Sequence, residues 1–132
     1  MIEKANEERI REVLAPFGPA AVYVFGSAAT GRIRSDSDLD LAILPSAPIS
    51  ALKLFEARMQ LAEIVRRDVD LIDLSSASTV LCKEVLAGGR LLYETDVLRR
   101  AEFEMYSLSD YARLNEERAP VLTALGQPLK NG

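Results

Sequence analysis

The chain has 132 residues, of which 48% are hydrophobic and 27% charged, and its net charge at pH 7 is −4. This length and apolar share suit one domain with its own core. The acidic balance argues against direct nucleic-acid binding, which favours a basic excess. With no histidine and one cysteine, Cys82, the chain excludes Ser-His-Asp triads and an internal disulfide framework. The absence of a long apolar run and the polar first residues predict a cytoplasmic protein with no membrane contact.

In chain order, an amphipathic helix comes first and a buried strand second. Residues 3–15 place apolar side chains at helical spacing among charges, and Pro16 ends this pattern. Val22–Phe25 is β-branched or aromatic, which predicts a buried strand. Gly26 then permits a tight turn and a close approach of the backbone to a ligand.

The segment after this strand carries polar and charged candidates for phosphate binding. Gly26-Ser27 is expected to end the strand and begin a short helix, whose free N–H groups attract phosphate, although an ordinary turn is the alternative. Arg32 and Arg34 either contact a triphosphate or are solvated loop charges, with the solvated state slightly favoured. Asp36 is interpreted as a turn residue or an outer-shell group and not as a metal ligand.

The second predicted strand begins with two aspartates separated by one residue. Because side chains alternate across a strand, Asp38 and Asp40 point to one face, and Leu39 and Leu41 point to the other. Two carboxylates on one face repel each other, and a divalent cation removes that conflict. Oxygen ligands of this kind suit Mg²⁺, which proteins hold through one or two carboxylates together with substrate phosphates.

A second helix is predicted to begin after Ser50, its N-cap, and to reach Arg66 or Arg67. Its apolar residues form one stripe at helical spacing, which we expect to be core and not a cofactor site. This stripe consists of Leu52, Phe55, Met59, Ala62 and Val65.

The third predicted strand, Asp68–Leu74, contains a carboxylate among residues that should be buried. Asp70 in this setting needs a partner, and a metal held by Asp38 and Asp40 would supply one. Asp73 falls on the opposite face, near the end of the strand, where we expect it to cap the following turn.

The rest of the chain predicts a helix, a short strand and a long helix. A turn and helix over 75–87 contain Cys82 as a small core residue and end at Gly88-Gly89. Arg90–Glu94 is a strand that extends the sheet. A long helix is predicted from Asp96 toward Leu114, with Pro120 interrupting it.

These elements predict an α/β fold, a small mixed sheet with helices on one main face and an exposed catalytic edge. We expect residues 1–114 to form the domain and residues 115–132 to form a partly mobile C-terminal extension.

Three carboxylates and a Gly-Ser turn at one end of a sheet predict a phosphoryl-transfer site. Asp38 and Asp40 would hold Mg²⁺ on a triphosphate, and Asp70 would complete the site and orient or deprotonate an incoming hydroxyl. Histidine is not required as a base when a metal already lowers the pKa of the nucleophile.

This pattern resembles the nucleotidyltransferase superfamily related to DNA polymerase β. The matching residues are Gly26-Ser27, ten intervening residues, Asp38-Leu39-Asp40, and Asp70 in a later apolar strand. The short length, and the segment from Ala87 to Glu94 ahead of the last helix, resemble its minimal nucleotidyltransferase (MNT) branch.

The resemblance implies a palm-like nucleotidyltransferase fold and an antitoxin that uses ATP and Mg²⁺ to attach AMP to a tyrosine of a HEPN-domain toxin. It further implies that Gly26 and Ser27 bind the nucleotide, and that Asp38, Asp40 and Asp70 are catalytic metal ligands. Many relatives carry an arginine where this chain has Ala29-Thr30, a difference that Arg32 or Arg34 would have to compensate. A hetero-oligomer with the toxin is the expected assembly.

Two other functions remain open. The chain could neutralise a toxin by steric binding without catalysis, although retaining a complete set of costly carboxylates argues against this. It could transfer a nucleotide to a small molecule, although such enzymes generally add an acceptor-binding domain, for which this chain offers only its last helix.

Overall fold

The computed structural model describes residues 2–26 and 38–124, and side chains are described up to residue 117. The predicted helices and strands within these ranges are present, with ends shifted by a few residues except at the last helix, which is longer. In chain order they are α1 (Lys4–Leu14), the 3₁₀ helix η1 (Ala15–Phe17), β1 (Ala21–Phe25), β2 (Leu39–Leu44), α2 (Ala51–Val65), β3 (Val69–Asp73), α3 (Thr79–Gly88), β4 (Arg90–Glu94) and α4 (Val97–Ala124).

The four strands form one mixed sheet in the order β3-β2-β1-β4. β1 is antiparallel to both β2 and β4, and β2 is parallel to β3. A parallel pair requires a crossover connection, which α2 provides. The register places Phe25 opposite Asp40 and Asp40 opposite Asp70, so Asp40 lies between the end of β1 and Asp70 of β3.

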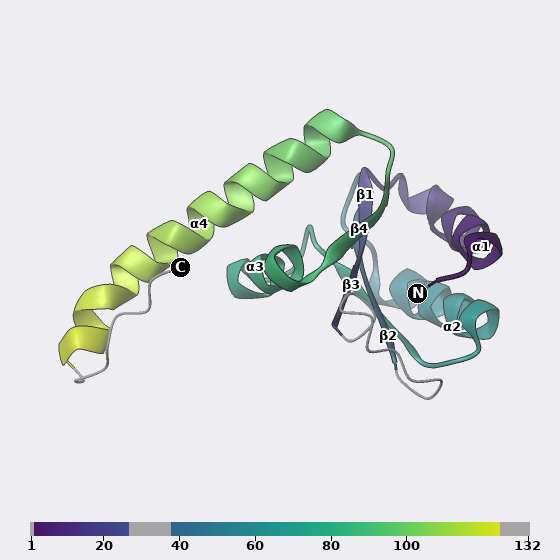
Figure 1. Ribbon diagram of the computed structural model, residues 1–132, viewed down its shortest axis with the longest axis horizontal. Coiled ribbons are helices and arrows are strands. Elements are labelled where there is room, and N and C mark those ends of the chain that lie inside the picture. Colours follow the sequence, from purple (N-terminus) through teal and green to yellow (C-terminus); the bar gives the residue numbers. More distant parts are fainter. Residues whose placement is uncertain (1, 27–37, 125–132) are drawn as a thin grey trace.

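Helices cover both faces of this sheet, so the expectation of one main helical face is wrong (Figure 1). One core joins α1 and α2 to alternate strand residues such as Val22, Val24 and Leu41. The other core joins α3 to the intervening residues, among them Tyr23 and Ala42. Because both alternating sets of β1 and β2 are largely apolar, each face of the sheet needs its own cover.

The predicted start of α2 is confirmed, whereas its predicted core stripe is wrong at three of five positions. The hydroxyl of Ser50 caps the helix by accepting a hydrogen bond from the N–H of Lys53 (3.2 Å). The exposed fractions of Leu52, Phe55 and Met59 are 65%, 57% and 55%.

A second apolar stripe of α2 faces the sheet instead. Ala57 and Leu61 are buried, and Leu54 packs against the same core. Successive residues of an α-helix are about 100° apart, so this stripe and the Phe55–Met59 stripe lie on different sides of the helix. The small side chain of Ala57 favours the buried side, because it lets the helix approach the sheet closely.

The last helix is longer than predicted. α4 runs from Val97 to Ala124 and continues through Pro120, so the predicted interruption is wrong. A proline removes one helical hydrogen bond and often kinks a helix without ending it. The proposed boundary at residue 114 falls inside α4 and stays a prediction.

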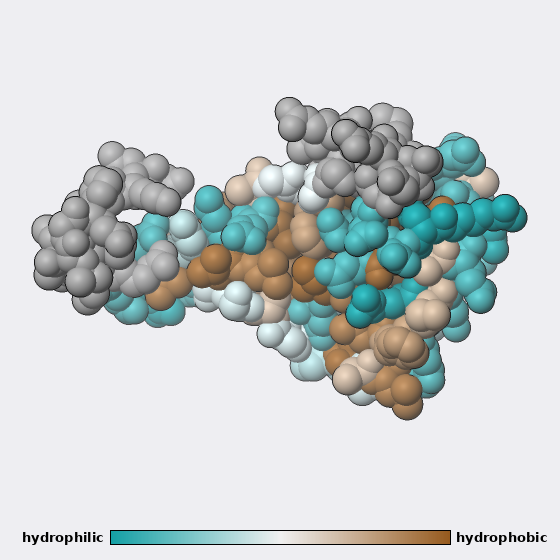
Figure 2. All heavy atoms as spheres, turned by 90° about the horizontal axis from the view of Figure 1, so that it is seen from below, coloured by the Kyte–Doolittle hydropathy of each residue, from teal (hydrophilic) through white to brown (hydrophobic). Residues whose placement is uncertain are grey.

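Beyond α3, α4 extends as an arm from the body of the molecule (Figure 1). Figure 2 shows apolar residues exposed on the α4 side of the molecule. Met105 and Leu108 are about half exposed, at 57% and 52%. Within the described ranges, no helix combines the length and the apolar character that crossing a membrane requires.

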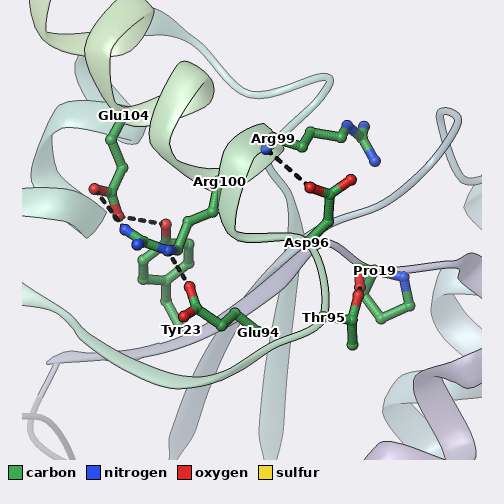
Figure 3. A network of polar contacts seen from close by, with 8 residues as sticks. All are labelled: Pro19, Tyr23, Glu94, Thr95, Asp96, Arg99, Arg100 and Glu104. Carbon is green, nitrogen blue, oxygen red and sulfur yellow. Dashed lines mark hydrogen bonds and ion pairs between the residues drawn. The ribbon is translucent and has the colours of Figure 1, made fainter.

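The base of α4 is fastened to the sheet by a network of polar side chains (Figure 3). The hydroxyl of Tyr23 on β1 donates to Oε1 of Glu104 (2.8 Å). Nη1 of Arg100 donates to Oε2 of Glu104 (3.0 Å), and its Nε donates to Glu94 on β4. Burial first, and the hydrogen bond to Glu104 second, raise the pKa of Tyr23 above its ordinary value.

Candidate active site

An open cavity of about 400 Å³ lies at the β2–β3 side of the sheet. Its acidic wall consists of Asp38, Asp40, Asp68 and Asp70. Its opposite wall comes from α2 and consists of Phe55, Arg58, Met59 and Ala62, and Val69 of β3 completes the lining. The cavity therefore combines a concentrated negative charge with a mostly apolar wall that carries one cation, Arg58.

Strand pairing brings the predicted carboxylates together. Asp40 and Asp70 are partners in the parallel β2–β3 register and so lie on the same face of the sheet. Leu39 and Leu41, the neighbours of Asp40 in sequence, are fully buried in the core on the other face. The structure thus places Asp38, Asp40 and Asp70 around one cavity, while their roles as ligands stay predictions.

The three carboxylates differ in their accessibility. Asp70 is exposed, although we expected burial, because the cavity leaves this face of the edge strand β3 open. Asp40 is intermediate, and its pKa is raised by burial first and then by the charges of Asp70 and Asp38. Mutual repulsion of this kind favours the binding of a cation.

Gly26 lies directly beside this acidic group. Its φ is +70°, a conformation that side chains disfavour, and a Cβ at this position would collide with Oδ2 of Asp40. The backbone conformation therefore favours a glycine here, and a side chain would also have to displace the carboxylate of Asp40. Ser27, Arg32, Arg34 and Asp36 lie outside the described residues.

The acidic cavity is not a closed metal cage. Among residues 2–26 and 38–124, no three acidic or cysteine side chains converge closely enough to hold a metal ion alone. An acidic wall open to solvent nevertheless fits Mg²⁺, because this ion is usually held by one or two carboxylates, waters and substrate phosphates.

Asp73 has the structural role that its place on the opposite face predicts. It is 7% exposed and accepts hydrogen bonds from the N–H (2.9 Å) and hydroxyl (2.6 Å) of Ser75 and from the hydroxyl of Ser76 (3.3 Å). It also accepts from the N–H of Ile49 (2.9 Å). Asp73 therefore caps the turn and ties the end of β3 to the segment that enters α2.

Sequence reasoning missed the α2 wall and Asp68. Nε of Arg58 donates to the carbonyl of Val69 (3.2 Å), which fixes this guanidinium beside β3. Alternation places Asp68 on the same side as Asp70, and this signal was available in the sequence. The signal for Phe55 and Met59 was the presence of two apolar stripes on α2, more than one buried face requires.

A mixed sheet that presents paired aspartates beside a glycine turn defines the class of the nucleotidyltransferases. The family model described as polymerase beta, nucleotidyltransferase, matches residues 8–97. The chain belongs to this family.

Two relatives of this chain are protein adenylyltransferases. The chain is 33% identical over 123 residues to the protein adenylyltransferase MntA of Shewanella oneidensis, a match that covers 92% of this chain and 88% of the relative. It is also 33% identical over 82 residues to MntA of Thermococcus cleftensis, covering 62% of this chain and 80% of that protein.

Solved structures resemble the whole fold. A chain of a toxin–antitoxin crystal structure with AMP-PNP has a TM-score of 0.81 at 33% identity and covers 91% of this chain and 98% of its own length. A chain from the structure of the tri-AMPylated Shewanella oneidensis HEPN toxin in complex with MNT antitoxin has a TM-score of 0.76 at 31% identity, covering 94% and 98%.

Proposed function

We propose that this protein is an antitoxin that transfers AMP from ATP to a tyrosine hydroxyl of a HEPN-domain toxin and thereby silences it. The observation that carries the proposal is the placement of Asp38, Asp40 and Asp70 around one cavity beside Gly26. The relative from Shewanella oneidensis, a protein adenylyltransferase, supports protein as the acceptor. The similar MNT antitoxin in complex with a tri-AMPylated HEPN toxin supports the transferred group and the partner.

The proposal assigns the nucleotide to the side of the cavity next to β1. Gly26 and Ser27 bind the triphosphate through backbone N–H groups, since a glycine lets the backbone approach a ligand closely. Asp38 and Asp40 hold Mg²⁺ jointly with phosphate oxygens, which suits a cavity without a closed cage. The bound ion supplies charge neutralisation at the phosphates and a lower pKa for the nucleophile.

The residues of the chain then position a direct displacement. The tyrosine oxygen forms a bond to the α-phosphorus of ATP, the bond from that phosphorus to the bridging oxygen of the β-phosphate breaks, and pyrophosphate leaves. Asp70, exposed in the cavity opposite Asp40, orients the hydroxyl and accepts its proton. ATP as substrate is consistent with a cytoplasmic location.

The test uses ATP labelled at the α-phosphate, Mg²⁺ and the HEPN toxin encoded beside this protein. We expect label on the toxin, loss of label on adding EDTA with restoration by excess Mg²⁺, and no label with the Asp38→Ala, Asp40→Ala double variant. Absence of label with wild type, or equal label with the double variant, contradicts the proposal. Toxin neutralisation by the double variant would instead support steric inhibition without catalysis.

A further inference from the structure

The apolar wall of the acidic cavity is exposed and has no role in the proposed chemistry so far. Phe55 and Met59 are 57% and 55% exposed, yet both line the cavity that contains Asp70. We propose that these two side chains form a seat for the aromatic ring of the acceptor residue and so select a tyrosine of the partner. This inference rests on the proposed function and adds the residues that recognise the acceptor.

The order of the strands assigns this wall to the acceptor and not to the nucleotide. β2 lies between β1 and β3, so Asp40 has the Gly26 turn on one side and Asp70 on the other. α2 packs on the other face of the sheet, and its Phe55–Met59 side reaches around the edge strand β3 to line the same cavity as Asp70. A triphosphate bound at the turn leaves the Phe55–Met59 side for the incoming hydroxyl.

Charge and polarity specify the kind of side chain that fits. Four aspartates and one arginine, Arg58, line the cavity, so its net charge is negative and an acceptor with its own negative charge would be repelled. A neutral phenol avoids this repulsion, because its ring contacts Phe55 and Met59 while its hydroxyl reaches Asp70. Aromatic pairs and sulfur–aromatic contacts both stabilise such an arrangement.

The seat is built on a helix whose position is fixed at two points. Asp73 accepts a hydrogen bond from the N–H of Ile49, just before α2 begins. Arg58, in the middle of α2, donates to the carbonyl of Val69 on β3. These bonds hold α2 against β3 and so fix the position of Phe55 relative to Asp70. A preorganised surface of this kind loses little freedom when the acceptor binds.

The experiment compares Phe55→Ser, Met59→Ser and the double variant with wild type. Three quantities are measured: the KM for the HEPN toxin, the affinity for labelled ATP, and the affinity for the toxin without ATP. We expect each single variant to raise the toxin KM about tenfold, as loss of a buried anchor does, with weaker toxin binding and ATP affinity within about twofold of wild type. Phe55→Leu, which keeps apolar bulk, should recover part of the loss.

Leu98→Ser is the matched control, since Leu98 is an apolar residue 78% exposed on α4, outside the cavity. It should leave all three quantities unchanged. A variant that loses ATP affinity but keeps its toxin KM would assign the seat to the adenine base and overturn the inference, as would variants with unchanged toxin KM. If wild type transfers no label, the proposed function fails. The seat is then tested by toxin binding alone, and it is rejected if the double variant binds the toxin as tightly as wild type does.

Discussion

Two regions of this molecule bring carboxylates close together, with opposite consequences. At the base of α4, Glu104 accepts hydrogen bonds from Tyr23 and Arg100, and Arg100 also pairs with Glu94 (Figure 3). In the cavity, the charged groups that act on Asp40 are Asp70 and Asp38, and both raise its pKa.

The difference separates a structural cluster from a functional one. Carboxylates with their own donors and cations stabilise the fold, and the network fastens α4 to β1 and β4. A group of like charges costs stability until a cation or substrate binds, and such groups are concentrated at functional sites. Neutralising a carboxylate should therefore have opposite effects in the two regions.

The largest effect is expected in the cavity. Asp40→Asn should lower kcat/KM for toxin labelling by about a thousandfold or more, because it removes a carboxylate that would hold the metal ion on the phosphates. Its unfolding free energy in urea should equal or exceed that of wild type, because the repulsion with Asp38 and Asp70 is relieved. Glu102→Gln, which neutralises an exposed acidic residue of α4, is the control. Full activity of Asp40→Asn, or a marked loss of its stability, would contradict a functional role for the carboxylates of the cavity.

An intermediate effect is expected at the base of α4. Glu104→Ala should lower the unfolding free energy by about 2 kcal/mol, because it leaves the buried Tyr23 hydroxyl without its acceptor. Labelling per folded molecule should persist, since Glu104 does not line the cavity. The midpoint in urea measures this loss, and Glu102→Ala shows what an exposed position costs. If Glu104→Ala is as stable as Glu102→Ala, the network does not stabilise the fold.

The smallest effect on the unfolding free energy at neutral pH is expected for Tyr23→Phe. Its effect should instead appear in how the unfolding free energy changes with pH. The pKa of Tyr23 is raised from 10.0 in the folded state, so its contribution is complete below pH 10 and is lost as pH rises through the raised value. Wild-type stability should therefore fall above pH 10 more steeply than that of the variant, by up to about 1.4 kcal/mol per pH unit.

Tyr93 sets the background for this measurement. Burial raises its pKa to about 12, so it contributes a similar loss in both proteins. Equal slopes of unfolding free energy against pH between 10 and 12 would show that Tyr23 ionises as freely in the folded chain as in the unfolded one.

Local patterns predicted the parts of the fold that depend on near neighbours. The alternation around Asp38 and Asp40, the cap at Ser50 and the turn role of Asp73 follow from strand and helix geometry within a few residues. The pairing of Asp40 with Asp70 depended on one further step, the parallel pairing of two strands joined by a helix.

The errors arose where a choice depended on distant residues. α2 has two apolar stripes, and its periodicity alone does not say which one faces the sheet. A proline does not by itself end a helix, and α4 continues past Pro120 to Ala124. The second helical layer was missed although both alternating sets of β1 and β2 are largely apolar, because the helix that covers each face is set by packing between distant elements.

The sequence by itself determined the chemistry available to this protein: no histidine, two aspartates one residue apart at the start of a strand, a third in a later strand, and a glycine after the first strand. Only the tertiary structure decided which apolar side chains border that chemistry. Burial is set by packing between elements far apart in the chain, so Phe55 and Met59 became the wall of a cavity when Ala57 and Leu61 took the place against the sheet.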